Sequence, residues 1–220
     1  MNETSKTKTF WGETEKSVLV GRGIDIGCGT DPVLPSALPF DVETGDANDI
    51  LKYVNGPFDY VYSSHCLEHM DDPRKALQDW WSLVVPGGHL FLIVPDEDLY
   101  EQGHFPSIFN PDHKATFTIG KARSWSPASI NLLDLVKSLP GAEVVIIQLQ
   151  DQGYDRSLQT HAMLSGRLGR ILQLAYSLTR WMPGMKARRF PAALCNFLPV
   201  DQTLRYGALA QIQCIARKKP

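Results

Sequence analysis

Short apolar runs of strand length recur along this chain, separated by polar or glycine-rich breaks. Runs of this length that are rich in β-branched and aromatic residues predict buried strands. We expect strands over residues 23–27, 58–64, 90–94, 143–149 and 208–216. The run at 90–94 is apolar throughout and does not alternate, as expected for a parallel strand that is covered on both faces.

Stripes of apolar residues at helical spacing lie between some of these runs. One stripe follows Asp72-Pro73, where an acid before a proline is typical of a helix start, and Pro86-Gly87-Gly88 comes after its end. A second stripe, capped by residues 126–129, predicts a helix that ends at Gly141. The order strand, helix, strand predicts βαβ units and an α/β fold.

The segment after the first strand cannot form a regular helix. Pro32, Pro35 and Pro39 each remove an amide donor and fix φ. We expect an irregular loop there, then two very short strands, at 39–42 and near 45–47. The early part of the sheet is therefore contracted.

Length and composition describe an ordinary domain. The 220 residues are enough for one sizeable core, and a net charge of −2 gives no sign of nucleic-acid binding. The four cysteines are far apart and form no C-x-x-C pair, so neither a zinc site nor a disulfide framework is expected. No signal peptide and no run of ~20 apolar residues is found. We expect a cytoplasmic location.

A glycine turn at residues 27–29 ends the first strand. Gly27 and Gly29 lack Cβ atoms, so a ligand can touch the main chain there. Asp25 lies inside the strand end and needs a donor, which a cationic ligand group would supply. Pro32 occupies the third glycine position of a dinucleotide motif, and no Gly-Lys-Ser/Thr follows for a phosphate loop. A ligand with an amino acid end and a nucleoside end remains.

Three motifs together resemble the class I S-adenosylmethionine-dependent methyltransferases. They are D-I-G-C-G at 25–29, F-D-Y-V-Y-S-S-H-C-L-E-H at 58–69 and P-G-G at 86–88. The resemblance covers roughly residues 21–149. It implies a Rossmann-like fold with a mostly parallel seven-stranded sheet, shortened after strand 1 and with a helical insertion before the last strand. We expect an N-terminal arm, 1–20, and one methyltransferase domain, 21–220.

The resemblance also implies S-adenosylmethionine as the cofactor. Asp41 matches the acid that holds the ribose hydroxyls and Asp46 the acid that receives the adenine, although one of them could be a surface turn acid. Ser63, Ser64 and His65 match the strand end beside the sulfonium. The expected cofactor residues are Asp25, Gly27, Cys28, Gly29, Thr30, Asp41, Asp46, Ala47, Ser63, Ser64 and His65.

A long polar segment, 95–125, leaves the carboxyl end of the strand at 90–94. Ligands of open parallel sheets bind at that edge, and connections of this length are usually functional. We expect it to bind the acceptor, through Asp96, Tyr100, His104, His113 and Lys114.

Three histidines are candidates for a general base. His65 comes first because of its strand-end position, His113 second and His104 third. His65 could instead cap a helix or contact the cofactor. Glu68 and His69 are expected to brace the following helix and to point away from the methyl group. No metal ligands are expected, although residues 96–98 offer three adjacent acids as an alternative.

A basic segment, 154–207, precedes the last strand. Residues 156–190 contain seven positive charges and no acid, and apolar residues recur beside them at helical spacing. Three interpretations stay open: a helical cover over the site, a contact with a membrane or lipid-linked substrate through 156–190, or a homodimer interface. Phe10 and Trp11 either pin the arm to the core or cap a ligand.

The residues at 95–114 are similar to those of bacterial methyltransferases found with polysaccharide biosynthesis. This resemblance implies O-methylation of a sugar or glycan hydroxyl, for instance on a lipid-linked polysaccharide such as O-antigen at the inner face of the membrane. Two alternatives stay open. One is a small-molecule methyltransferase of secondary metabolism, and the other is a non-catalytic scaffold with a methyltransferase-like fold.

Overall fold

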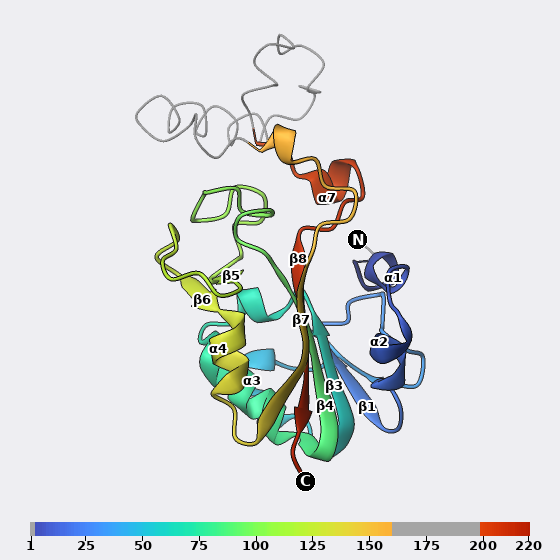
Figure 1. The fold of residues 1–220 in the computed structure, drawn as a ribbon. Helices are drawn as coiled ribbons and strands as arrows, with labels where there is room; N and C mark the ends of the chain where they lie inside the picture. Colours follow the sequence, from blue (N-terminus) through green and yellow to red (C-terminus); the bar gives the residue numbers. More distant parts are fainter. Residues whose placement is uncertain (1–2, 160–198) are drawn as a thin grey trace.

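A computed structural model describes residues 3–159 and 199–220 (Figure 1). Its centre is a six-stranded sheet in the order β2-β1-β3-β4-β8-β7. The strands β2, β1, β3 and β4 pair in parallel, and β8 is antiparallel to both of its neighbours. The strands are β1 (Gly23–Ile26), β2 (Leu38–Phe40), β3 (Phe58–Ser64), β4 (Val84–Pro95), β7 (Ala142–Gln150) and β8 (Gln211–Lys218). The predicted α/β class and the mostly parallel sheet are confirmed.

The predicted count of seven strands is wrong by one. Where a third short strand was expected, the described chain forms a 3₁₀ helix, η1 (Ala47–Lys52). Asp46 caps η1, because its side chain accepts a hydrogen bond from the Asn48 amide. A capping carboxylate favours a helical turn over an extended strand, so the contraction removes the strand completely.

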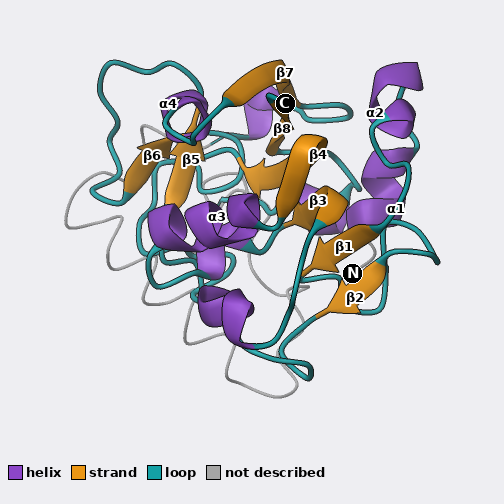
Figure 2. Ribbon diagram, turned by 90° about the horizontal axis from the view of Figure 1, so that it is seen from below, coloured by secondary structure: helices purple, strands orange, loops and turns teal. Residues whose placement is uncertain are grey.

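Each face of the sheet is covered by helices (Figure 2). The helices α3 (Pro73–Ser82) and α4 (Leu132–Lys137) pack on one face, and their apolar residues join those of β1, β3 and β4 in the larger core cluster. The short helices α1 (Glu3–Lys8) and α2 (Glu13–Ser17) lie on the other face. Burial on both faces explains why these strands have such continuous apolar runs.

Trp11 joins the N-terminal arm to the sheet. Its ring lies 5.1 Å from that of Phe91 and 6.0 Å from that of Tyr62, measured between centroids. Trp11 is buried, whereas Phe10 is 48% exposed. Of the two sequence interpretations, Trp11 therefore follows the first and pins the arm to the core.

The structure confirms the predicted start of one helix and moves the start of the other. The start of α3 is as predicted: Asp72 is its N-cap, accepting from the amides of Arg74 and Lys75, and Pro73 is its first residue. The helix predicted from residues 126–129 starts later, because Ser129–Asn131 forms β6 and pairs in parallel with β5 (Thr116–Thr118). Asn131 then caps α4.

The segment before β8 is described at its two ends. These contain the 3₁₀ helix η3 (Arg156–Leu158) and α7 (Gln202–Arg205). Most of the predicted basic segment, including Arg167, Arg170 and Arg188, lies outside the described residues. Within residues 3–159 and 199–220, no helix has the length and hydropathy needed to cross a bilayer.

Candidate active site

A cavity of about 830 Å³ opens at the carboxyl ends of β1, β2 and β3. This is the edge at which open parallel sheets bind ligands, and the volume is in the range of small-molecule sites, ~300–1,000 Å³. Its walls are Gly27, Phe40, Asp41, Val42, Gly45, Asp46, Ala47, Tyr53, His65, Cys66, His69, Met70 and Asp112. We call it the cofactor cavity.

Gly27 forms the floor of the turn and cannot carry a side chain there. Its φ is +78°, and its amide donates to the Phe40 carbonyl at 2.7 Å, which ties the end of β1 to β2. A Cβ at this position would lie 2.6 Å from the Cβ of Cys66. Both the positive φ and the packing of Cys66 therefore require glycine at this wall of the cavity.

Two acids stand on the rim beside this turn. Asp41 accepts hydrogen bonds from the amides of Gly29, at 2.5 Å, and Val42, at 2.7 Å. Asp46 accepts from the Asn48 amide, which lowers the pKa of its carboxyl. Both carboxylates line the cofactor cavity, so the predicted ribose and adenine acids are brought to one site.

Asp25 has a different surrounding from the one expected. Its side chain is buried and accepts a hydrogen bond from the Val33 amide at 2.6 Å, within the proline-rich segment. Burial raises the pKa of this carboxyl to about 7. The expected donor for this carboxylate is present within the chain, and a contact of Asp25 with a cationic ligand group stays a prediction.

Five of the predicted cofactor residues line the cavity: Gly27, Asp41, Asp46, Ala47 and His65. Asp25, Cys28, Gly29, Thr30, Ser63 and Ser64 lie outside its walls. Ser63 donates its hydroxyl to the Ile26 carbonyl at 2.9 Å, so its side chain links β3 to β1. The contribution of these six to cofactor binding stays a prediction.

A second cavity, of about 380 Å³, adjoins the first, and we call it the acceptor cavity. His65 and His69 line both cavities. The other walls of the acceptor cavity are Glu3, Glu68, Tyr100, Phe109, Asn110, His113, Asp201, Thr203, Leu204, Ala210 and Gln211. The two spaces therefore meet at a pair of imidazoles.

Two of the five predicted acceptor residues, Tyr100 and His113, line the acceptor cavity, and the other three do not. Asp96 accepts from the amides of Asp98 and Leu99, so it closes a turn. Lys114 forms an ion pair with Asp71 at 2.5 Å. His104 lies outside the walls of this cavity. The segment 95–125 thus reaches the site through part of its length.

His65 stands at the junction of the two cavities with an unusual backbone. Its φ is +53°, in the left-handed region, which turns the chain sharply after β3. Its Nε2 is 2.9 Å from Oε1 of Gln211, and its Nδ1 is 3.5 Å from Oε1 of Glu68. Burial lowers the His65 pKa, but Glu68, Glu3 and Gln211 together raise it by more, so the net shift is upward.

His113 is held by a second carboxylate. Its Nδ1 is 2.6 Å from Oε1 of Glu101, and both side chains are buried. The Tyr100 ring packs against the His113 ring with 5.3 Å between centroids. Since a carboxylate only accepts, Nδ1 of His113 carries the proton, and Nε2 is the nitrogen with a free lone pair when the ring is neutral.

The comparisons with known proteins agree with this geometry. A family model described as a methyltransferase domain matches residues 5–182. This chain belongs to that methyltransferase family. A curated relative, ajmaline N-methyltransferase of Rauvolfia serpentina, is 27% identical over 172 residues, which is 76% of this chain and 53% of the relative. The chain therefore spans about half the length of the curated relative it matches.

Solved structures show the same methyltransferase fold. A proposed sarcosine dimethylglycine methyltransferase from Galdieria sulphuraria has a TM-score of 0.50 and 12% identity, over 99% of this chain and 85% of that one. The YcgJ protein of Bacillus subtilis also has a TM-score of 0.50 and 12% identity, over 94% of this chain and 97% of that one. At this identity the likeness concerns the fold alone.

Family membership confirms the predicted methyltransferase class and its cofactor, S-adenosylmethionine. The residues present fit that cofactor. The cofactor cavity has sufficient volume, a wall at Gly27 that carries no side chain, and two rim carboxylates able to accept hydroxyl and amino protons.

Glu68 and His69 line the candidate site, which the sequence interpretation did not foresee. They form the 3₁₀ helix η2 (Leu67–His69) and line the acceptor cavity, and their expected orientation away from the methyl group stays a prediction. The left-handed turn at His65 places them there, because it redirects the residues that follow into the site. The available signal was their position directly after a strand end at the ligand edge.

Proposed function

We propose that this chain is an S-adenosylmethionine-dependent O-methyltransferase whose acceptor is a hydroxyl group of a sugar or glycan. The observation that carries the proposal is the junction of the two cavities at His65 and His69. A group transfer needs two reactants held in line, and alignment of that kind can contribute ~7–11 kcal/mol to lowering the barrier. Adjoining cavities with shared walls support such an alignment.

The acceptor cavity has the polar walls that a polyhydroxyl molecule needs. Asn110 and Thr203 offer an amide and a hydroxyl group, and Tyr100 and Phe109 add ring faces, 5.8 Å apart between centroids. Small-molecule sites combine apolar faces with a few convergent polar groups in this way. These walls support a sugar ring with several hydroxyls better than an extended apolar chain.

Bound S-adenosylmethionine supplies a methyl group activated by the positive charge on its sulfur. The chain has to orient the hydroxyl and receive its proton. In this proposal the proton goes to Nδ1 of His65, because Nε2 of His65 is committed to Gln211. Glu68, 3.5 Å from Nδ1, would stabilise the imidazolium, and the raised pKa makes His65 a stronger base.

An amine acceptor is the second candidate. The carboxylates of Glu3, Glu68 and Asp201 line the acceptor cavity and would attract a cationic small molecule. The curated relative from Rauvolfia serpentina is an N-methyltransferase. This favours the alternative of a small-molecule methyltransferase of secondary metabolism. A scaffold that binds the cofactor without turnover is the third alternative.

Transfer of a labelled methyl group distinguishes these candidates. The acceptors are nucleotide-activated sugars, lipid-linked sugars and a set of small amines, assayed in parallel with cofactor binding by calorimetry. Label in a sugar ether supports the proposal, whereas label in an amine overturns it in favour of the second candidate. Cofactor binding with no transfer to any acceptor supports the scaffold.

The role of His65 is tested with His65→Asn, because asparagine tolerates the left-handed backbone better than alanine. We expect turnover to fall by ~10²–10⁴-fold, the usual contribution of a general base, with cofactor affinity unchanged. His89→Ala, in β4 at the opposite edge of the sheet, is the control and should keep full turnover. A loss below tenfold in His65→Asn removes His65 from this role.

A lipid-linked acceptor is the narrower form of the proposal. It relies on the positive charges of residues 156–190, of which 160–190 lie outside the described residues. An anionic membrane surface, or a diphosphate linking sugar to lipid, would attract such a segment. The other two interpretations assign the same segment to a homodimer interface or to a cover over the site.

A further inference from the structure

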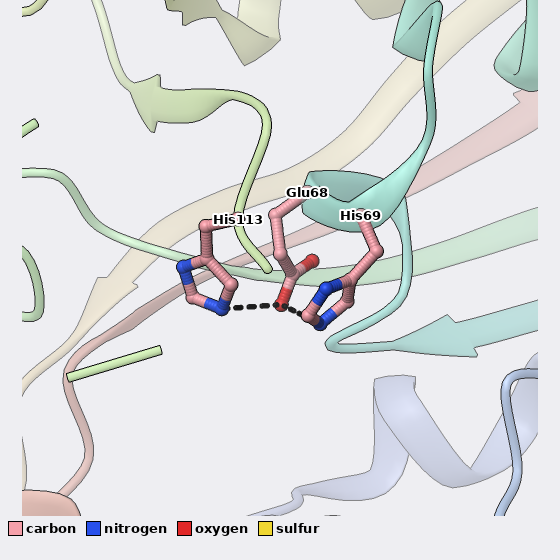
Figure 3. A group of neighbouring side chains, drawn as sticks. All are labelled: Glu68, His69 and His113. Atoms are coloured by element: carbon pink, nitrogen blue, oxygen red, sulfur yellow. Dashed lines mark ion pairs between the residues drawn. The ribbon is translucent and has the colours of Figure 1, made fainter. Parts of the chain in front are cut away.

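Three side chains that offer metal-ligand atoms converge in the wall of the acceptor cavity (Figure 3). Glu68 and His69 come from η2, and His113 comes from the segment between β4 and β5. Figure 3 shows one Glu68 oxygen between the two imidazoles. Oε1 of Glu68 is 3.9 Å from Nε2 of His113 and 4.0 Å from Nε2 of His69.

Both imidazoles are oriented so that Nε2 is the free nitrogen. Nδ1 of His69 is 3.2 Å from the carbonyl oxygen of Asp112, and Nδ1 of His113 is 2.6 Å from Oε1 of Glu101. Carbonyl and carboxylate oxygens only accept, so each Nδ1 donates and each Nε2 faces Glu68 with a lone pair in the neutral ring. Metal-bound histidines are held in this manner, with the second nitrogen donating to a carboxylate or carbonyl.

His65 adds a third nitrogen to this arrangement. The Gln211 amide donates to Oγ1 of Thr7 and to Oε1 of Gln150, so its own oxygen must accept the proton on Nε2 of His65. Nδ1 of neutral His65 therefore also turns a lone pair towards Glu68, at 3.5 Å. When the three imidazoles are neutral, no proton lies between these four groups.

The Glu68 carboxylate has no hydrogen-bond donor that compensates its burial. It is 1% exposed, and among the described residues neither of its oxygens accepts a hydrogen bond. A buried carboxylate without a partner is costly, so a cation is needed. A protonated histidine would have to approach to ~2.7–2.9 Å to form a charge-assisted hydrogen bond. The separations of 3.5 Å to His65, 3.9 Å to His113 and 4.0 Å to His69 are all too long for that bond.

The same separations suit an ion between the ligands. With bonds of ~2.0–2.2 Å, the ligand atoms around a tetrahedral ion lie ~3.4 Å from one another. The ligand atoms of Glu68, His69 and His113 all lie within 4.8 Å of one another. Shifts of each ligand atom by a few tenths of an ångström therefore bring all three to bonding distance from one central ion. Two imidazoles and one carboxylate are a set typical of divalent first-row transition metals with open coordination positions.

We propose that Glu68, His69 and His113 bind one divalent first-row transition-metal ion, whose open positions face the acceptor cavity and take the acceptor's oxygen. The ion's position follows from the cluster alone. Its role rests on the proposed function, because a bound ion would acidify the acceptor hydroxyl next to the cofactor cavity. His113 is then a metal ligand and not a base, and His65 stays the group that receives the proton.

Binding of Co²⁺ to the chelator-treated, metal-free protein is the direct test. Co²⁺ held by nitrogen and oxygen ligands absorbs visible light, and calorimetry on the same samples gives the stoichiometry and affinity. We expect one Co²⁺ per chain. Glu68→Gln, His69→Ala and His113→Ala should each weaken binding by more than tenfold, while His89→Ala should leave it unchanged. Urea unfolding, measured for every variant, verifies that it is folded.

Glu101→Gln separates a built site from adventitious binding. Glu101 orients His113 without contacting the ion, and loss of such a partner lowers metal affinity by ~10–100-fold. No stoichiometric Co²⁺ binding, or binding unaffected by the three ligand variants, overturns the metal site. Since this assay uses the protein and Co²⁺ alone, that result leaves the proposed methyl transfer standing. A protein that binds Co²⁺ but methylates no hydroxyl overturns only the proposed function.

Discussion

At the scale of single residues, this site is defined by buried charges and by the groups that compensate them. The side chains of Asp25, Glu68 and Glu101 are each 1% exposed, yet a different group offsets the cost of burying each carboxylate. Asp25 receives one amide proton, Glu101 faces an imidazole, and Glu68 faces three histidines at distances too long for strong hydrogen bonds. Buried ionisable groups of this kind concentrate at functional sites.

Asp25 gives a prediction about pH. Its pKa in the folded chain is about 7, above its ordinary value of 3.8. Between these values the folded chain binds the proton more tightly than the unfolded chain, so the free energy of unfolding should fall as pH rises from 4 to 7. Asp25→Asn keeps an acceptor for the Val33 amide and removes this dependence, which can amount to ~4 kcal/mol at most.

Urea denaturation of both proteins at several pH values between 4 and 7.5 measures the effect. The unfolding free energy of the natural chain should decline relative to Asp25→Asn across this range. Asp96, whose pKa burial raises to about 6, contributes equally to both proteins and cancels. Two parallel curves would show that Asp25 titrates normally.

Part of this residue-scale picture could be predicted from the sequence. Gly27, Asp41, Asp46 and His65 were found because each directly follows a strand or a turn that the apolar pattern locates. The clustering of Glu68, His69 and His113 could not be predicted, because it depends on a residue with left-handed backbone and on the fold of a long loop. Apolar spacing carries no information on either.

At the scale of elements, capping side chains decide where helices begin. Asp72 at α3 was recognisable because an acid and a proline stand together. The start of α4 was misplaced because Ser126 and Asn131 are both good caps, and only the pairing of β5 with β6 selects Asn131. Asp46 likewise turned an expected strand into η1. Short elements are decided by tertiary contacts more than by local propensity.

The cap of α3 gives a prediction at this scale. Asp72→Ala removes the acceptor of two backbone amides and should lower the free energy of unfolding by about 1 kcal/mol, the usual loss at an N-cap. Asp71→Ala is the control, because Asp71 is an exposed neighbour whose ion pair with Lys114 contributes little. Thermal and urea unfolding compare the two, and equal losses would contradict the capping role.

At the scale of the whole molecule, charge is unevenly distributed. The chain has a net charge of −2, yet residues 156–190 contain seven basic residues and no acid. The sequence alone identifies this asymmetry, which the fold class does not explain. If the segment meets an anionic membrane surface, the attraction should weaken with salt and with charge reversal.

A triple variant tests that contact: Arg167, Arg170 and Arg188 each changed to Glu. We expect co-sedimentation with vesicles containing anionic lipid to fall several-fold, because each basic residue near such a surface contributes about 1 kcal/mol. Reversal of Arg74, Arg123 and Lys137, exposed residues elsewhere, changes net charge equally and serves as the control. Equal vesicle binding by both triple variants would contradict the membrane contact, and the cover and the dimer interface would remain as interpretations.

The direction of β8 has a practical consequence for attaching other sequences. Because β8 is antiparallel to β4, its last residues lie beside His89, at the edge of the sheet opposite the cavities. Glu3, in contrast, is itself a wall of the acceptor cavity. Figure 1 shows the N and C marks at correspondingly distant ends. An affinity tag or fluorescent label joined before Glu3 would crowd the entrance for large acceptors, so reporters belong after Pro220.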